Sequence, residues 1–162
     1  LRTLLLGHRH EGMTDDTELL LMFAARAEHL QARILPALSA GSWVLCDRFT
    51  DATYAYQGYG RGIDLGRIAI LEQWVQGERR AGLTLLLGLP VEIGLERAGK
   101  RSTPDRFESE AFAFFERVRN GYLSLANAQP DRFRVIDAAQ SLQQVSDQVV
   151  SAIDAFLDGK AS

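Results

Sequence analysis

Apolar residues follow two patterns along this chain: short continuous runs, and positions repeated at helical spacing. Mainly apolar runs at 43–46, 83–87 and 133–136 are typical of buried parallel strands. The helical spacing predicts helices over about 16–38, 50–57, 64–79, 107–127 and 141–157. Strands separated by helices require crossover connections, so the expected fold class is α/β: a three-layer parallel sheet with helices on both faces.

Capping residues place several helix ends. Asp15 with Glu18 three residues later resembles a capping box at the start of the first helix, and Pro36 is expected to kink or shorten its end. Residues 19–25 of this helix are apolar almost all round, so we expect burial on more than one side. Asp64 caps the helix that runs to about residue 79, and Pro90 starts a further helix.

Size and charge narrow the class of protein. The 162 residues form one expected domain, 1–162, and the net charge of −3 argues against a global hold on nucleic acid or an anionic membrane. No apolar run approaches the ~20 residues that a bilayer requires. The single cysteine, Cys46, cannot form an intramolecular disulfide, which favours a reducing compartment, the cytoplasm. Residues 1–6 read like the end of an element already under way, so we expect the natural N-terminus to precede them.

The first apolar run ends in two charged residues, Asp47 and Arg48. A carboxylate at the end of a buried parallel strand is typical of a residue that holds Mg²⁺ near phosphates. A neighbouring guanidinium can bind a phosphate through two parallel hydrogen bonds. The alternative is a strand end with a helix cap and a surface arginine.

Aromatic and polar residues with suitable spacing could bind a base. Phe23 and Arg26 share a helix face, where a ring offers a stacking platform and a guanidinium can donate to a base carbonyl. Thr53, Tyr56 and Gln57 could contact the base edge and the sugar. The alternatives are a core phenylalanine with a solvated arginine, and a helix with interfacial tyrosines.

A basic segment near 97–106 contains Arg97, Lys100, Arg101 and Arg106, and could act as a lid over a phosphate site; a surface charge run is the alternative. Residues 7–14 match the spacing of a phosphate-binding loop, but Met13 stands where its lysine is required. The two histidines of that segment are expected to be solvated, and Cys46 to be an inert core thiol.

The order and spacing of these segments resemble the thymidylate kinase family of P-loop nucleoside monophosphate kinases. The most specific parts are residues 21–26, 47–49, 53–58 and 60–62, and residues 105–108 and 135–138 add support. The resemblance extends from residue 1 to about residue 156. It implies a P-loop NTPase-like fold.

The resemblance also implies roles at the base. Phe23 would stack on thymine, and Arg26 would donate to a carbonyl of the base. Thr53 would read the edge that distinguishes thymine. Tyr56 and Gln57 would assist around the sugar and base.

Further roles concern the phosphates. Arg48 would bind the phosphate of dTMP, and Asp47 would act at the Mg²⁺ and phosphate end. Arg101 matches a lid arginine that reaches the transferring phosphate, and Arg97 matches a position that packs on the adenine of ATP. Another lid arginine of some relatives is Gly99 here.

One departure from the family pattern is large. The family begins with a strand, the P-loop, a helix, a second strand and an Arg-Glu-Pro-Gly segment, which we expect to precede residue 1 over about 45–55 residues. Without them, the first strands of the sheet and the cradle for the ATP phosphates are missing. This chain alone is therefore expected to be inactive.

The implied reaction is ATP + dTMP → ADP + dTDP, with Mg²⁺ and a homodimeric enzyme that binds neither nucleic acid nor membrane. One alternative is another P-loop kinase that acts on a deoxynucleoside or a different nucleotide. A second is a non-catalytic nucleotide-binding fragment. A third is a structural α/β domain that binds no nucleotide.

Overall fold

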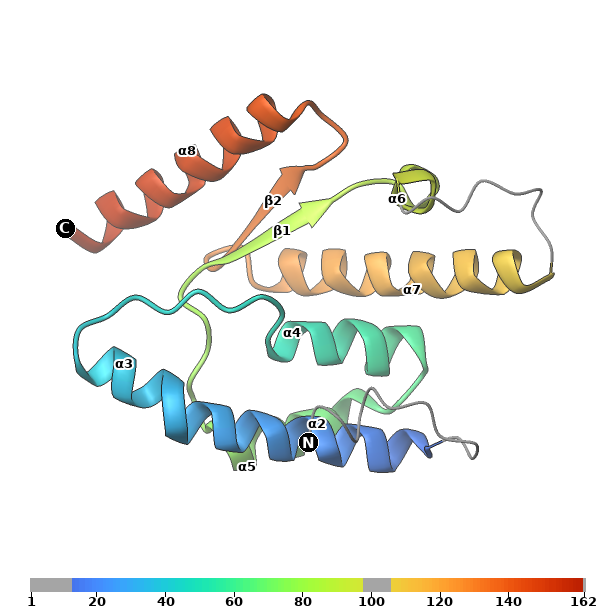
Figure 1. The fold of residues 1–162 in the computed structure, drawn as a ribbon, viewed down its shortest axis with the longest axis horizontal. Helices are drawn as coiled ribbons and strands as arrows, with labels where there is room; N and C mark the ends of the chain where they lie inside the picture. Colours follow the sequence, from blue (N-terminus) through green and yellow to red (C-terminus); the bar gives the residue numbers. More distant parts are fainter. Residues whose placement is uncertain (1–12, 98–105, 162) are drawn as a thin grey trace. The chain divides into compact units, whose positions relative to one another are not determined.

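The computed structural model describes residues 13–97 and 106–161 (Figure 1). The chain divides into two compact units, residues 1–80 and 81–162. The expected lid near 97–106 lies mostly outside the described residues. No helix within the described ranges combines the length and the apolar character that a membrane crossing requires.

The first unit opens with a continuous helical stretch made of α2 (Asp15–His29), the π-helix η1 (Leu30–Ile34) and α3 (Leu35–Ser39). Its N-cap is Thr14, which accepts a hydrogen bond from the backbone of Thr17, so the prediction of Asp15 as the cap was wrong by one residue. The wide turn of η1 precedes Pro36, whose missing N–H interrupts the regular hydrogen-bond ladder.

The apolar segment 19–25 of α2 is buried to different degrees around the helix. Leu19 and Phe23 are each 2% exposed, whereas Leu20 is 55% exposed. Leu21, Met22 and Ala25 are half-buried, so the expected burial on more than one side is met in part, and the side with Leu20 and Ala24 is exposed. The apolar composition of 19–25 therefore predicted a helix, but it did not indicate which side of the helix packs against another element.

A second helical stretch combines α4 (Thr50–Thr53) with the π-helix η2 (Tyr54–Gly60). The sequence predicted a helix over about 50–57. The helix instead continues to Gly60, and Gly58 packs closely against the side-chain ends of Leu65 and Ile68. The absence of a Cβ thus allows close packing here.

Helix α5 (Leu65–Gln76) begins as predicted, since the side chain of Asp64 accepts from the backbone N–H of Arg67 at 3.0 Å. Ile68 is fully buried and forms a core cluster with Leu19 and Phe23 of α2. The core of the first unit therefore fixes α2 against α5.

The predicted strand at 43–46 is absent from the structure. These residues form no strand, and Trp43 and Leu45 are 74% and 98% exposed. Cys46 is half-buried, not a core residue as expected. A short apolar run becomes a strand only where a neighbouring strand supplies hydrogen bonds, and in the described part of the chain the sheet consists of two other strands.

The second unit contains β1 (Thr84–Gly88) and β2 (Phe133–Asp137), which pair in parallel with Leu86 opposite Val135. Helices α6 (Val91–Arg97) and α7 (Arg106–Ala128) connect them, and α8 (Leu142–Ala161) follows. Figure 1 shows α7 and α8 on opposite sides of the two strands, and both helices contact β2. The predicted crossover with helices on both faces is confirmed for this unit.

Candidate nucleotide site

Arg26 of α2 lies at the centre of a partly buried cluster in the first unit. Its Nη2 donates to Oγ1 of Thr53 at 2.8 Å, and its Cζ lies 4.6 Å from the ring centroid of Phe23 and 5.4 Å from that of Phe49. Burial lowers the pKa of Arg26 to about 10, and the negative charge of Glu72 partly opposes this shift. The guanidinium therefore stays charged at neutral pH in an aromatic surrounding.

Phe23 belongs to the core, with 2% of its surface exposed and Arg26 over its ring. For a base to stack on this ring, the side chains that cover it, including Arg26, would have to move. The stacking of thymine on Phe23 stays a prediction.

Gln57 of η2 forms a second contact with α2. It is 4% exposed, and its Nε2 donates to Oε1 of Glu18 at 3.0 Å. The other oxygen of Glu18 accepts from Nη1 of Arg61 at 2.5 Å. Two hydrogen bonds therefore join α2 to the stretch 50–60: Arg26 donates to Thr53, and Gln57 donates to Glu18.

Two buried polar atoms in this region have no hydrogen-bond partner among the described residues: Nη1 of Arg26 and Oε1 of Gln57. Buried polar groups are almost always paired in folded proteins, and an unpaired one calls for a ligand or water. One atom is a charged donor and the other a neutral acceptor. The predicted base site therefore offers complementary hydrogen-bonding groups that the protein does not use.

Arg48 has a left-handed backbone conformation, with φ at 62°, although it is not a glycine. Its exposed guanidinium lies 5.0 Å from the ring centroid of Tyr56, and its carbonyl accepts from the Cys46 thiol at 3.5 Å. Burial raises the pKa of that thiol. Strained backbone conformations often occur at functional sites.

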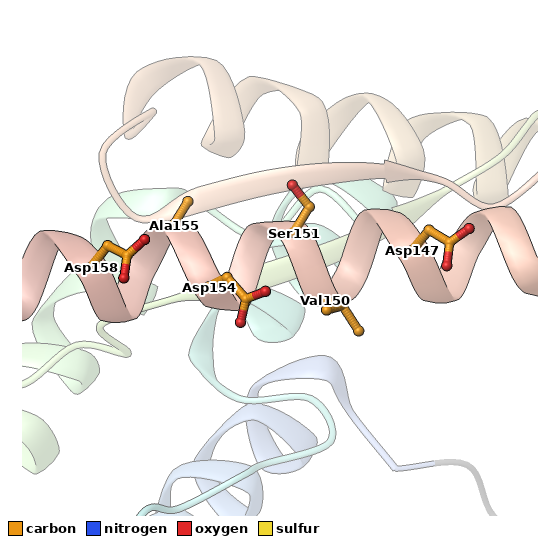
Figure 2. A pocket seen from close by; sticks show the side chains of 6 residues that line it. All are labelled: Asp147, Val150, Ser151, Asp154, Ala155 and Asp158. Atoms are coloured by element: carbon orange, nitrogen blue, oxygen red, sulfur yellow. The ribbon is translucent and has the colours of Figure 1, made fainter.

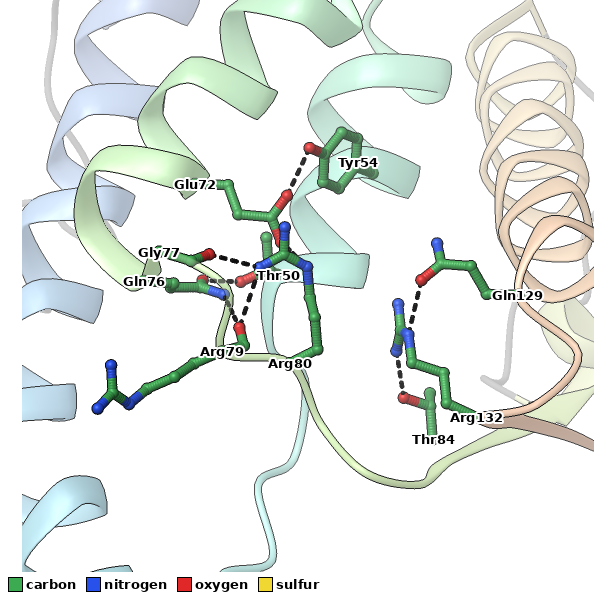
Figure 3. A network of polar contacts seen from close by, with 10 residues as sticks. All are labelled: Thr50, Tyr54, Glu72, Gln76, Gly77, Arg79, Arg80, Thr84, Gln129 and Arg132. Atoms are coloured by element: carbon green, nitrogen blue, oxygen red, sulfur yellow. Dashed lines mark hydrogen bonds and ion pairs between the residues drawn. The ribbon is translucent and has the colours of Figure 1, made fainter.

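A polar network fixes the stretch 50–60 against α5 (Figure 3). Tyr54 donates to the buried carboxylate of Glu72 at 2.7 Å, and Nε of Arg80 lies 3.0 Å from the same group. Burial and this hydrogen bond raise the pKa of Tyr54. Thr50 donates to the side chain of Gln76, which is also buried. The helical stretch that carries the predicted binding residues is therefore bonded to α5 as well as to α2.

The sequence matches the family model described as thymidylate kinase over residues 1–149. The chain belongs to the thymidylate kinase family. It is 60% identical to the thymidylate kinase of Pseudomonas entomophila over 159 residues, which cover 98% of this chain and 74% of that protein. The thymidylate kinase of Pseudomonas syringae pv. tomato is 62% identical over 90% of the chain and 69% of its own length. That of Alkalilimnicola ehrlichii is 54% identical, with 98% and 76% covered.

Members of the thymidylate kinase family have the P-loop NTPase fold and are ATP-dependent nucleotide kinases. The predicted family, fold class and type of enzyme are therefore confirmed. The parallel pairing of β1 with β2 agrees with this fold.

The predicted ATP-binding residues are only partly described. Arg97, at the end of α6, donates to the carbonyls of Ala138 at 2.7 Å and Ala139 at 3.3 Å in the turn after β2. Arg101 lies outside the described residues. Asp47 is exposed, and no group of three potential metal ligands comes together in the part of the chain that the structure describes.

Three residues of the site escaped the sequence reasoning: Glu18, Phe49 and Glu72. Glu18 was interpreted only as a helix cap, yet it binds Gln57. Glu72 lies four residues after Ile68 on the apolar side of α5, where an acidic residue signals a buried partner. Phe49 belongs to the segment 47–49 that carries part of the family resemblance, but no contact with Arg26 was predicted for it.

A shallow hollow elsewhere lies along one exposed side of α8 (Figure 2). It is lined by Asp147, Asp154 and Asp158 with small or aliphatic neighbours, and none of the predicted site residues is part of it. Carboxylates along one exposed helix face are ordinarily hydrated surface groups.

Proposed function

We propose that this protein transfers the γ-phosphoryl group of ATP to dTMP and releases ADP and dTDP, a step in dTTP synthesis. Membership of the thymidylate kinase family supports the reaction. The single structural observation that supports the acceptor is the pair of buried, unpartnered atoms on Arg26 and Gln57.

At the base, Arg26 donates from Nη1 to a carbonyl oxygen of thymine, and Gln57 accepts from a ring N–H through Oε1. Thr53 holds the guanidinium through its other nitrogen, at 2.8 Å. Phe23 provides the stacking surface, and Tyr56 lies beside the sugar. A charged donor inside a partly buried cluster makes a stronger hydrogen bond than one in water.

At the acceptor phosphate, Arg48 is the binding residue. Its guanidinium is exposed and is oriented by the ring of Tyr56, 5.0 Å away. The phosphate oxygen of dTMP attacks the γ-phosphorus of ATP directly, so no protein nucleophile is required. Catalysis then consists of alignment and of stabilisation of the charge that develops on the transferring group.

At the ATP end, we assign Arg97 to the adenine and Arg101 to the transferring phosphate. Asp47 would hold Mg²⁺, and one exposed carboxylate suits this ion because magnesium is commonly bound by one or two carboxylates together with substrate phosphates. When bound, Mg²⁺ neutralises charge on the ATP phosphates.

We further propose that the enzyme is a cytoplasmic homodimer. The single cysteine fits a reducing compartment. Helix α2 leaves Leu20 55% exposed, an apolar side chain that a second copy could cover. Light scattering coupled to size-exclusion chromatography tests the dimer, and a monomer at all concentrations contradicts it.

The deciding experiment measures ADP release by the complete protein with dTMP, dUMP, dCMP and thymidine as acceptors. We expect the highest kcat/KM with dTMP. A preference for thymidine or dCMP would replace this proposal with another kinase of the same fold. Calorimetry with dTMP supplies the second arm: binding without turnover would indicate a non-catalytic nucleotide-binding protein, and no binding would refute the acceptor site.

A further inference from the structure

The two ends of the Gln57 amide have different surroundings. Nε2 donates to Oε1 of Glu18 at 3.0 Å, whereas Oε1 of Gln57 has no partner among the described residues. The side chain is 4% exposed, so bulk water does not readily hydrate that oxygen. The carbonyl end is therefore available for a ligand that can donate a hydrogen bond.

The charge on Glu18 determines this orientation. A carboxylate only accepts hydrogen bonds, and both oxygens of Glu18 are used: one by Gln57 and the other by Arg61 at 2.5 Å. The amide can therefore direct only its NH₂ group toward Glu18. Turning the amide over would place two oxygens against each other. Glu18 is 21% exposed, so water weakens this preference less than it would on an open surface.

Gln57 and the group that holds Arg26 lie on one side of the same helical stretch. Thr53 and Gln57 are four residues apart between 50 and 60, and each bonds to α2, Thr53 with Arg26 and Gln57 with Glu18. The site thus combines the unused donor of Arg26 with the unused acceptor of Gln57.

This pair distinguishes pyrimidines by the order of groups along the base edge. Thymine and uracil present a carbonyl oxygen followed by a ring N–H, which complements a donor followed by an acceptor. Cytosine in the same placement presents an amino group to Arg26 and a bare ring nitrogen to Gln57. Both contacts are then mismatched, and a mismatched buried polar group discriminates strongly.

We propose that Glu18 is a positioning residue that sets base specificity, because it holds Gln57 with the carbonyl oxygen toward the base. Glu18 itself does not touch the nucleotide. The inference rests on the proposed function, in which Arg26 and Gln57 contact the base of dTMP.

The substitution Glu18→Gln tests this role in the complete protein. The new side chain can donate to Oε1 of Gln57, so the amide can turn and present its NH₂ group to the base. We expect the ratio of kcat/KM for dTMP to kcat/KM for dCMP to fall at least tenfold. The change should lie mainly in a higher KM for dTMP, with kcat with saturating dTMP changing much less. Glu18→Asp, which retains the carboxylate, should recover most of the ratio.

Two controls separate specificity from structure. Arg61→Gln removes the other partner of Glu18 but leaves the carboxylate, and it should keep the wild-type ratio. Asp16→Asn breaks an ion pair with Arg67 at 2.9 Å on the exposed surface of the same helix, and it should also leave the ratio unchanged. Glu18→Ala, which removes the carboxylate without supplying a donor, is measured in parallel in case the glutamine variant does not fold.

The outcomes also separate this inference from the proposed function. A wild-type protein that neither binds nor phosphorylates dTMP refutes the proposed function, and the role of Glu18 with it. A wild-type preference for dTMP that persists undiminished in folded Glu18→Gln or Glu18→Ala overturns the role of Glu18 alone.

Discussion

Two substitutions, Arg48→Gly and Arg48→Ala, separate the contribution of the Arg48 side chain to activity from the effect of its left-handed backbone on stability. With φ at 62°, Arg48 adopts a conformation that costs a residue with a side chain about 1–2 kcal/mol. Glycine has no such cost, although it loses about 0.5–1 kcal/mol through the greater freedom of its unfolded chain. At the midpoints of these ranges, Arg48→Gly should therefore be more stable than Arg48→Ala by about 0.75 kcal/mol.

Both variants lose the same contacts. The guanidinium over the ring of Tyr56 disappears in each, so the cation–π contribution cancels when the two are compared. Their thermal midpoints should differ by about 2 °C, in favour of glycine, for a protein of this size. In the kinase assay both should lose at least about 100-fold in kcat/KM for dTMP, of order 3 kcal/mol.

Differential scanning calorimetry and steady-state kinetics on the complete protein test the two halves of this prediction. Arg33→Ala serves as the matched control, because Arg33 is an exposed arginine of η1, and it should change neither property appreciably. Equal stability of the glycine and alanine variants would show that the backbone of Arg48 is not strained. An unchanged rate in both would remove Arg48 from the phosphate site.

Four further predictions concern single side chains. Thr53→Val removes the acceptor for Arg26, so KM for dTMP should rise about tenfold, or 1.4 kcal/mol, and an unchanged KM would show that this hydrogen bond does not position the guanidinium. Tyr54→Phe removes a donor to Glu72 and should lower the free energy of unfolding in urea by about 1 kcal/mol; an unchanged midpoint contradicts this. Hydrogen bonds from the side chain of Gln140 and the backbone of Ala139 lower the pKa of Asp137, so its NMR titration midpoint should lie below that of an aspartate in an unfolded chain. Its stabilisation is present above the unfolded-state pKa and is lost as pH falls through the folded-state pKa; Asp137→Asn should abolish this dependence. Burial raises the pKa of Cys46, so the native thiol should react with Ellman's reagent more slowly at pH 8 than the urea-unfolded chain, and an equal rate would contradict this.

Local sequence signals predicted the elements that depend on local physics. The cap at Asp64, the strands near 84–88 and 133–137, and the helices after them were each placed within a few residues. Helix caps, helical spacing of apolar residues and short buried runs each depend on residues that are close in sequence, so they can be predicted from the sequence. The run at 43–46 failed because strand formation depends on a partner elsewhere in the chain.

The candidate site divides in the same way. The spacing of Phe23 and Arg26 predicted a shared helix side, and Thr53 and Gln57 were predicted to contact the base from their chemistry. No spacing rule indicates that α2 lies against the stretch 50–60 with an arginine opposite the threonine and Glu18 opposite the glutamine, 27 and 39 residues away. Yet this pairing leaves one donor and one acceptor unused. The chemical identity of the binding residues was therefore readable from the sequence, whereas the direction in which each presents its hydrogen-bonding atoms depends on tertiary packing. If that is correct, substitutions at partners such as Glu18 should alter which base is accepted, whereas loss of Arg48 should weaken every monophosphate acceptor alike.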